Sequence, residues 1–264
     1  MINFIGCSFT WGQGLYFEEW HKNNISSDKI NSYINRQDFD HESLSYNDHL
    51  IRKEKHFPNL VSKHFDRDYT TQFFNGGSNY RILQYCDIVG GQFPTTDIVV
   101  VQFTSPLRMD EKDKTYMKNQ SQDIISDAHN SFKDYNVYEK MISTLDKDDI
   151  IPENVCKDLY TQIYLCNEKI DSYPNRINWI GISWFPEAGF IVKEFFKKHY
   201  IPIYYKDTEY LGFEDILPLD NLSLKNHIQG CGDDHFSSEG HIVLSNSIIK
   251  KIEQDNLFKD INIK

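Results

Sequence analysis

An unbroken run of β-branched apolar residues, Ile98-Val99-Val100-Val101, is the feature that most limits how this chain can fold. The run lies within Asp97–Phe103 and is followed at once by Thr104-Ser105-Pro106. A strand with one face in water alternates apolar and polar residues, whereas a strand covered on both faces is apolar throughout. The run therefore predicts a central strand of a parallel sheet with helices on both sides.

Four further segments have the composition of short strands, and helical patterns lie between them. The predicted strands are Ile2–Ile5, Tyr69–Phe74, Ile177–Trp184 and Ile201–Tyr205. The predicted helices are 57–65, 79–89, 151–173, 190–196 and 240–252. Because strand and helix alternate, we expect an α/β fold, a doubly wound sheet of about five parallel strands sandwiched by helices. Such a sheet binds ligands at the carboxyl ends of its strands.

The chain has 264 residues, with no internal repeat and no linker long enough to divide it. We therefore expect one domain spanning residues 1–264. Two polar, weakly patterned regions, at about 18–55 and about 110–150, are expected to be insertions that elaborate the surface and lie outside the core.

The charge balance and the cysteines limit the compartment and the partners. Lys and Arg number 28 against 39 Asp and Glu, a net charge of −11, so neither nucleic acid nor a membrane surface is an expected partner. We recognise no run of membrane-spanning length and no secretory signal. The five cysteines are odd in number and form no C-x-x-C pair, which favours a reducing compartment. We expect a cytoplasmic or virion-associated protein, of an oligomeric state that the sequence leaves open.

Small and polar residues gather in four segments, just after predicted strands or just before a predicted helix. These are residues 6–10, 75–79, 102–105 and 232–241. The carboxyl ends of parallel strands meet at one edge of a sheet, so the first three segments are expected to converge there. A serine after a strand, such as Ser8, is by itself typical of a turn. It becomes a nucleophile when an imidazole, oriented by an acceptor, takes its proton, and His235 in the last segment supplies that group.

With Ser8 after the first strand and a D-x-H segment before the final helix, the chain resembles the SGNH/GDSL hydrolase superfamily, through short blocks spread over nearly its whole length. The resemblance implies that Ser8 is the nucleophile and His235 the base. The superfamily carries its aspartate three residues before the histidine, where this chain has Gly232. Asp233 is therefore the expected third member of the triad, with Asp234 as the alternative and a Ser–His dyad as another. The G-x-S-x-G sequence of the α/β-hydrolases is absent, since residues 6–10 are G-C-S-F-T.

The same resemblance implies an oxyanion hole formed by the backbone N–H of Ser8, a glycine of the second block and an asparagine of the third. Gly76 matches the glycine, with Gly77 as the alternative register. The third block has no asparagine at the matching position. Its place is expected to be taken by a hydroxyl or an amide, from Thr104, Ser105 or Asn79.

From these residues we expect a serine ester hydrolase, an acyl or acetyl esterase whose substrate is a polar small-molecule or glycan ester. The insertions lack the broad apolar stripe of a lipase lid, and the resemblance also implies an O-acetylated carbohydrate. Several aromatic residues after Ser8 are candidates for stacking on sugar rings, with core packing as the alternative for two of them: Trp11, Tyr16, Phe17 and Trp20. No cofactor or metal is expected, because no G-x-G-x-x-G, P-loop or EF-hand sequence is present. The alternative is a non-catalytic protein with the SGNH fold, a carbohydrate-binding or structural component, for example of a virion.

Overall fold

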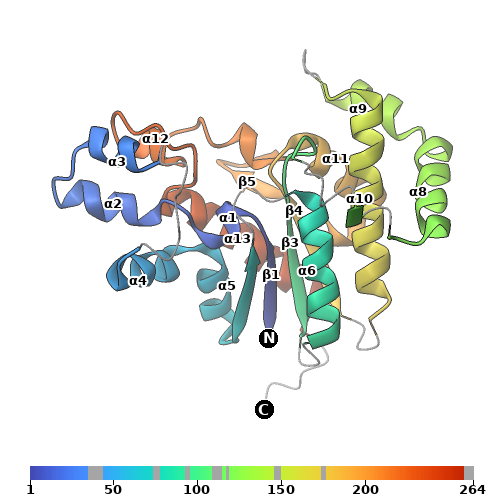
Figure 1. Cartoon of the computed structure of the whole chain (residues 1–264), viewed down its shortest axis with the longest axis horizontal. Coiled ribbons are helices and arrows are strands. Elements are labelled where there is room, and N and C mark those ends of the chain that lie inside the picture. Colours follow the sequence, from blue (N-terminus) through green and yellow to red (C-terminus); the bar gives the residue numbers. More distant parts are fainter. Residues whose placement is uncertain are drawn as a thin grey trace.

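The structure is a computed structural model that describes residues 1–34, 44–73, 78–92, 96–108, 115–116, 119–145, 150–173 and 177–258. It is an α/β fold built on a four-stranded parallel sheet with the strand order β2-β1-β3-β4 (Figure 1). The strands are β1 (Ile2–Gly6), β2 (Tyr69–Phe73), β3 (Ile98–Phe103) and β4 (Asn178–Ser183). The expected α/β class and the strands expected at these four places are confirmed.

Helices connect the strands and flank the sheet. The α-helices are α1 (Ser8–Trp11), α2 (Leu15–Lys22), α3 (Ser27–Ile34), α4 (Tyr46–Lys55), α5 (Phe57–Phe65), α6 (Asn79–Gln92), α8 (Gln122–Asp134), α9 (Val137–Thr144), α10 (Glu153–Asp171), α11 (Pro186–Phe195), α12 (Leu224–His227) and α13 (Ser238–Asp255). Short 3₁₀ helices are η2 (Lys197–His199) and η3 (Phe213–Asp215). Among the helices in the described ranges, none combines the length and the apolar character that crossing a bilayer requires.

The packing of β3 explains why its first four residues, Ile98 to Val101, are all apolar. Successive residues of a strand point to opposite faces of the sheet. Ile98 and Val100 pack into one apolar core with α5 and α13, and Val99 and Val101 pack into the other with α6, α10 and α11. All four side chains are therefore buried in apolar surroundings, on both faces of the sheet.

The fifth strand, expected over residues 201–205, is not a strand of this parallel sheet. The N–H of Ile201 donates to the carbonyl of Gly181 in β4, at 3.1 Å, and the chain then leaves the sheet edge. Residues Ile203–Tyr205 form β5, which pairs antiparallel with β6 (Thr208–Tyr210). Pro202 lies between Ile201 and β5. Proline is typical of the edge of a sheet, where its missing N–H costs no ladder hydrogen bond.

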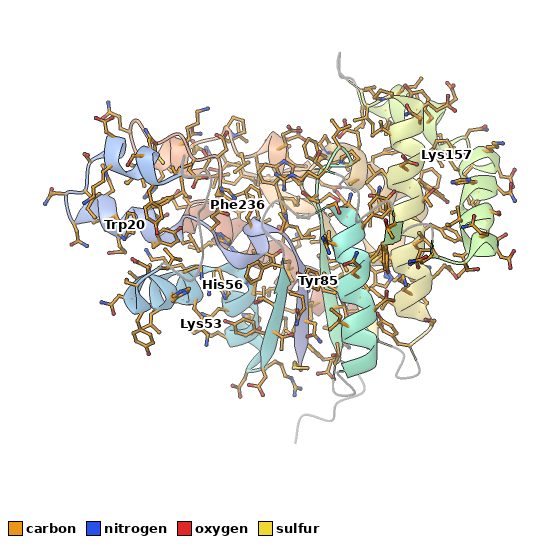
Figure 2. All side chains as sticks on the ribbon, in the orientation of Figure 1. Trp20, Lys53, His56, Tyr85, Lys157 and Phe236 are labelled. Carbon is orange, nitrogen blue, oxygen red and sulfur yellow. The ribbon has the colours of Figure 1, made fainter. Side chains whose placement is uncertain are left out.

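The two regions expected to be insertions are largely helical and lie at opposite ends of the molecule (Figures 1 and 2). Helices α2 to α4, which carry Trp20 and Lys53, lie at one end, and α8 and α9 lie at the other, beside the part of α10 that carries Lys157. The expectation that these regions lie outside the core is wrong for part of each. Their buried apolar residues are Ile30 and Leu44 in the first region, and Ala128, Phe132, Val137, Met141 and Leu145 in the second.

Each region buries these side chains against a neighbour that is distant in sequence. Ile30 and Leu44 form a small separate core with Tyr16, Phe17 and residues around α12. Phe132 of α8 and Val137 and Met141 of α9 join the core that covers one face of the sheet. Val137, Met141 and Leu145 recur every four residues, a spacing typical of a buried helix face, so the sequence does contain a signal for this helix. In the first region Ile30 and Leu44 each lie between polar residues, which gives no such signal.

Candidate active site

Ser8 lies at the carboxyl end of β1, where the strand turns directly into α1. The turn is tight because position 6 is glycine: a Cβ there would overlap the Thr10 hydroxyl and approach the Gln102 side chain. Gln102, buried in β3, accepts a hydrogen bond from the Thr10 hydroxyl at 2.5 Å and donates to Cys7 Sγ at 3.3 Å. The neighbouring strand therefore fixes the turn that carries Ser8.

The hydroxyl of Ser8 meets His235, a residue 227 positions away in the sequence, with Ser8 Oγ and His235 Nε2 separated by 2.8 Å. On the other side of the imidazole, His235 Nδ1 is 2.5 Å from Asp233 Oδ1. The same carboxylate oxygen accepts the backbone N–H of His235 at 2.9 Å. A hydroxyl, an imidazole and a carboxylate are thus aligned in the order that nucleophilic catalysis by serine requires.

The carboxylate of Asp233 is buried, with 4% of the residue exposed. Burial by itself raises the pKa of a carboxyl group, but the attraction of His235 and the hydrogen bonds from its side chain and backbone outweigh this, and the pKa of Asp233 lies below its ordinary value. The neighbouring Asp234 has an exposed side chain, whose Oδ1 lies 3.6 Å from Lys225 Nζ. Asp233, rather than Asp234, is the residue that orients the imidazole.

Gly14, in the turn between α1 and α2, makes room for this carboxylate. Its backbone is left-handed, with φ of 84°, and a Cβ at this position would lie 2.9 Å from Asp233 Oδ2 and overlap the side chain of Leu224. Asp233 Oδ2 itself has no hydrogen-bond partner within the described part of the chain. Glycine is therefore favoured at position 14 for two reasons: the backbone is left-handed, and a side chain would overlap Leu224 and crowd Asp233.

An aromatic stack holds the imidazole from the side. The ring of Phe9 lies parallel to that of His235, with 4.4 Å between the ring centroids, and the ring of Trp184 lies 3.8 Å from that of Phe9. Sequence analysis missed both residues. The signal for Trp184 was available, since it follows β4 directly and so lies at the same edge of the sheet as Ser8.

The aromatic residues expected to face a sugar have other roles. Tyr16 and Phe17 are buried in the small core formed with α12. The stacking role is therefore wrong for these two residues, and the alternative of core packing is confirmed for them. The indole N–H of Trp20 donates to Asp48 Oδ1 at 2.8 Å, which joins α2 to α4. The side chain of Trp11 lies outside the described part of the structure.

The residues expected to form the oxyanion hole are only partly described. Gly76 and Gly77 lie outside the described residues. Asn79 and Thr104 contact each other: the Thr104 N–H donates to Asn79 Oδ1 at 2.8 Å, and Asn79 Nδ2 donates to the Thr104 carbonyl at 3.2 Å. The Thr104 hydroxyl accepts from Arg108 Nη1 at 3.2 Å, and the Ser105 hydroxyl accepts from the Leu107 N–H. The Asn79 amide thus ties the start of α6 to the end of β3.

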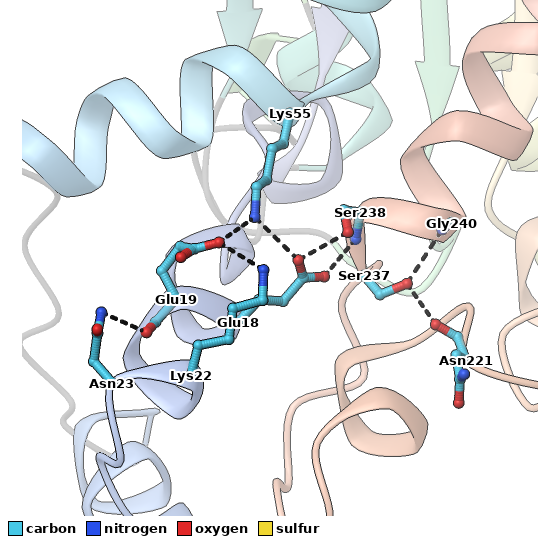
Figure 3. Close-up of polar contacts among 9 residues, drawn as sticks. All are labelled: Glu18, Glu19, Lys22, Asn23, Lys55, Asn221, Ser237, Ser238 and Gly240. Atoms are coloured by element: carbon cyan, nitrogen blue, oxygen red, sulfur yellow. Dashed lines mark hydrogen bonds and ion pairs between the residues drawn. The ribbon is translucent and has the colours of Figure 1, made fainter.

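The segment that carries His235 is anchored at the start of α13 (Figure 3). The carboxylate of Glu18, buried in α2, accepts the backbone N–H of Ser238 at 2.6 Å and its hydroxyl at 2.8 Å. Lys55 of α4 lies 3.3 Å from Glu18 and 3.0 Å from Glu19. The Ser237 hydroxyl caps the helix by accepting the Gly240 N–H at 3.2 Å. The first insertion therefore fixes the helix that begins three residues after His235.

A second histidine of this segment, His241, is buried and faces away from Ser8. Its Nδ1 accepts the backbone N–H of Phe57 at 3.1 Å. Burial, and to a smaller extent the positive charges of His56 and His235, lower the pKa of His241 well below its ordinary value. It is a neutral imidazole that joins α13 to α5.

A small pocket with a volume of about 270 Å³ includes Asp234, the residue before His235, in its lining. It is lined by Trp184, Glu214, Leu217, Pro218, Ser223, Lys225, Asn226 and Asp234, and is called here the Trp184 pocket. A more polar cavity of about 490 Å³ lies at the opposite edge of the sheet, where Met1 and Tyr69 mark the amino ends of β1 and β2. The described residues include no group of three or more His, Cys, Asp or Glu side chains arranged to hold a metal ion.

Comparison with known proteins gives no identity for this chain: no family model, no curated protein and no solved structure matches it. Inferences about its function therefore rest on the residues and geometry of the site.

Proposed function

We propose that the protein is a serine ester hydrolase of the SGNH type, in which Ser8 is the nucleophile, His235 the general base and Asp233 the residue that orients and stabilises the imidazole. The observation that carries the proposal is the continuous chain of contacts from Ser8 Oγ through His235 to Asp233, at 2.8 and 2.5 Å. The strand order β2-β1-β3-β4 and the position of the site at the carboxyl ends of the strands support a doubly wound sheet of this kind.

The proposed reaction has two halves. Ser8 Oγ attacks the ester carbonyl carbon while His235 Nε2 takes the hydroxyl proton, and the carbon–oxygen bond to the alcohol then breaks as His235 returns that proton to the departing oxygen. Water then attacks the acyl-serine carbonyl carbon while His235 Nε2 takes a proton from the water. The bond between that carbon and Ser8 Oγ breaks as His235 gives this proton to Ser8 Oγ, and the acid is released. The ionised Asp233 stabilises the imidazolium formed in each half. The N–H of Ser8 and that of Gly76 are the proposed donors to the oxyanion.

The proposed substrate is a polar ester, with an O-acetylated carbohydrate as the favoured class. Charged side chains, among them Asp234 and Lys225, lie on the segments next to the site, which supports a polar ester. The net charge of −11 likewise favours a small-molecule or glycan ester over nucleic acid or a membrane as partner. The proposed location is cytoplasmic or virion-associated.

The test is hydrolysis of p-nitrophenyl acetate by the wild-type protein and by Ser8→Ala, with the exposed Ser143→Ala as the matched control. The proposal predicts hydrolysis by the wild type and by the control, and a loss of about 1000-fold or more in Ser8→Ala. Activity is also expected to fall in acid, where a protonated imidazole cannot accept the serine proton. Equal rates for wild type and Ser8→Ala would reject Ser8 as the nucleophile.

One observation favours the second candidate, a non-catalytic binding or structural protein. The backbone N–H of Thr104 already donates to Asn79 Oδ1, and one N–H of the Asn79 amide already donates to the Thr104 carbonyl. Neither of these two N–H groups is therefore free to donate to an oxyanion. If both the wild type and Ser8→Ala are inert toward esters while a glycan binds to both, this candidate replaces the enzyme.

A further inference from the structure

Two of the five cysteines face each other in the core that covers one face of the sheet. Cys86 lies in α6 and Cys166 in α10, two helices that pack side by side (Figure 1). Their Sγ atoms are 3.7 Å apart, although the residues are 80 positions apart in the sequence. Both are free thiols and both are buried. The proposed ester hydrolysis uses neither of them.

Each cysteine lies on the face that its helix turns toward the shared core. On α6, Cys86 follows the buried Leu83 by three residues and the buried Ile82 by four. On α10, Cys166 follows the buried Ile163 by three residues. Residues three or four apart share one face of a helix, so both thiols point into the space between the helices.

Polar contacts near the surface hold the two helices together beside the thiols. Lys169 Nζ of α10 lies 2.6 Å from Asp87 Oδ1 of α6, the residue after Cys86. The Tyr173 hydroxyl, just beyond α10, donates to the carbonyl of Cys86. The packing of the helices therefore fixes the positions of the two sulfur atoms.

The separation of the sulfur atoms is small enough for a covalent bond to form without a change of fold. A disulfide has an S–S distance of about 2 Å, so the two side chains together have to move by less than about 2 Å. Rotation about their Cα–Cβ bonds and a small shift of the helices can supply this movement. The folded chain thus holds the second thiol within reach of the first.

The closed structure protects the two thiols from reagents. The contact with Cys86, followed by burial, raises the pKa of the Cys166 thiol well above its ordinary value. The thiolate is the form that attacks a disulfide, so exchange with a dissolved disulfide is slow while the helices are packed. It becomes faster when this part of the chain opens transiently and both thiols meet solvent.

We propose that Cys86 and Cys166 are a redox modification site, at which a disulfide oxidant such as oxidised glutathione converts the two thiols into a disulfide between α6 and α10. One thiolate attacks oxidised glutathione and releases one molecule of reduced glutathione. The other thiolate then attacks the mixed disulfide and releases the second. Two protein thiols are oxidised, the glutathione disulfide is reduced, and the two thiol protons go to the departing glutathione thiolates.

The new bond has two consequences for the protein. It joins residues 80 positions apart, which restrains the unfolded chain and stabilises the fold. It also fixes α6, whose first residue, Asn79, is hydrogen-bonded to Thr104 at the end of β3.

Peptide mapping of the wild-type protein tests the proposal. The reduced protein is incubated with equal concentrations of oxidised and reduced glutathione, at a urea concentration just below its unfolding midpoint, and is then returned to buffer. Free thiols are alkylated under denaturing conditions, and the protein is digested without reduction. A pair of peptides joined through Cys86 and Cys166 is expected, with the mass of two hydrogen atoms lost. Cys7, Cys156 and Cys231 are expected to be recovered alkylated.

The chain offers a matched control in Cys156, which is buried in the same helix and has Met141 Sδ, in place of a thiol, at the same 3.7 Å. Cys156→Ala is expected to form the disulfide to the same extent as the wild type. Oxidation is expected to raise the urea midpoint of both proteins by about 1 M. It is not expected to raise the midpoint of Cys166→Ala, in which Cys86 has no thiol to pair with.

Recovery of Cys86 and Cys166 from the wild type as alkylated thiols, or only as glutathione adducts, would overturn the proposal. Disulfides that join either residue to another cysteine as often as to its partner would overturn it as well. None of these readouts depends on ester hydrolysis, so the redox site and the proposed function stand or fail separately.

Discussion

Glu18 and Ser238 are 220 residues apart in the sequence and are joined by two hydrogen bonds, with the buried carboxylate accepting both the N–H and the hydroxyl of the serine. A carboxylate at this place also complements the positive end of the α13 dipole. The contact links the first insertion to the segment that holds His235. A region that is polar and weakly patterned in sequence therefore supports the site.

The first prediction concerns this contact. Glu18→Gln is expected to lower the free energy of unfolding by about 1–2 kcal/mol, because a charged acceptor at a helix start is replaced by a neutral one. Glu19→Gln is the control, since Glu19 is on the same helix and pairs with Lys22 and Lys55 nearer the surface. It is expected to cost about 0.5 kcal/mol or less. Urea unfolding measures both, and equal losses would contradict the assigned role.

The second prediction separates the two neighbouring aspartates. Asp233→Asn is expected to reduce the kcat of p-nitrophenyl acetate hydrolysis by about 10,000-fold, because an amide no longer stabilises the imidazolium or holds the right tautomer. Asp234→Asn, whose side chain points away from the imidazole, is expected to reduce it by no more than about tenfold. Steady-state kinetics measure the kcat of both variants. A larger loss of kcat in Asp234→Asn than in Asp233→Asn would assign the orientation of the imidazole to Asp234.

The third prediction concerns Gly14. Gly14→Ala places a methyl group 2.9 Å from Asp233 Oδ2, on a backbone with φ of 84°. We expect it to lower the free energy of unfolding by about 2 kcal/mol and to slow ester hydrolysis, because Asp233 has to move.

The matched control for Gly14 is Gly232→Ala. The added methyl group meets only Asn31 Oδ1, at 3.5 Å, within 4 Å in the described structure. This variant is expected to retain its stability within about 0.5 kcal/mol. Thermal unfolding and activity assays compare the stability and the hydrolysis rate of the two variants. Equal losses in both variants would contradict the conclusion that position 14 requires glycine.

The fourth prediction is a pH dependence of stability. His199 is buried, its Nδ1 lies 2.7 Å from the Trp179 carbonyl, and burial lowers its pKa to about 4. In the unfolded chain the pKa of this histidine returns to its ordinary value of 6.5, so between these values the unfolded state binds more protons. The stability that neutral His199 contributes is therefore fully present above about pH 6.5 and is lost as the pH falls toward 4.

This loss has a maximum slope of about 1.4 kcal/mol per pH unit for one proton. His199→Gln is expected to remove that part of the acid sensitivity, whereas His21→Gln, at an exposed position, is expected to leave it unchanged. Urea unfolding between about pH 4 and 7 gives the slopes. An unaltered slope in His199→Gln would show that the proton binds elsewhere.

Strands β1, β3 and β4 could be predicted from the sequence because burial on both faces leaves them largely apolar, and β2, which is half-buried, because of its Thr and aromatic residues. A strand does form at Ile203–Tyr205, but it pairs antiparallel with β6 and not with β4, and residue type alone does not reveal the partner. The helices α8 and α9 were placed outside the core because their region is rich in charged residues, although Val137 and Met141 have helical spacing. Whether such residues are buried depends on the neighbours that fold against them.

The sequence by itself determined the α/β class, four of the strands and the candidate residues Ser8, His235 and Asp233, because each depends on residue type and local order. Only the tertiary structure decided between Asp233 and Asp234, since adjacent side chains point in different directions and the choice depends on where the backbone turns. It also decided which residues support the imidazole: Phe9 stacks on it, Trp184 packs on Phe9, and Glu18 holds the start of the helix that follows it. These residues come from separate segments, and such contacts exist only once the chain is folded.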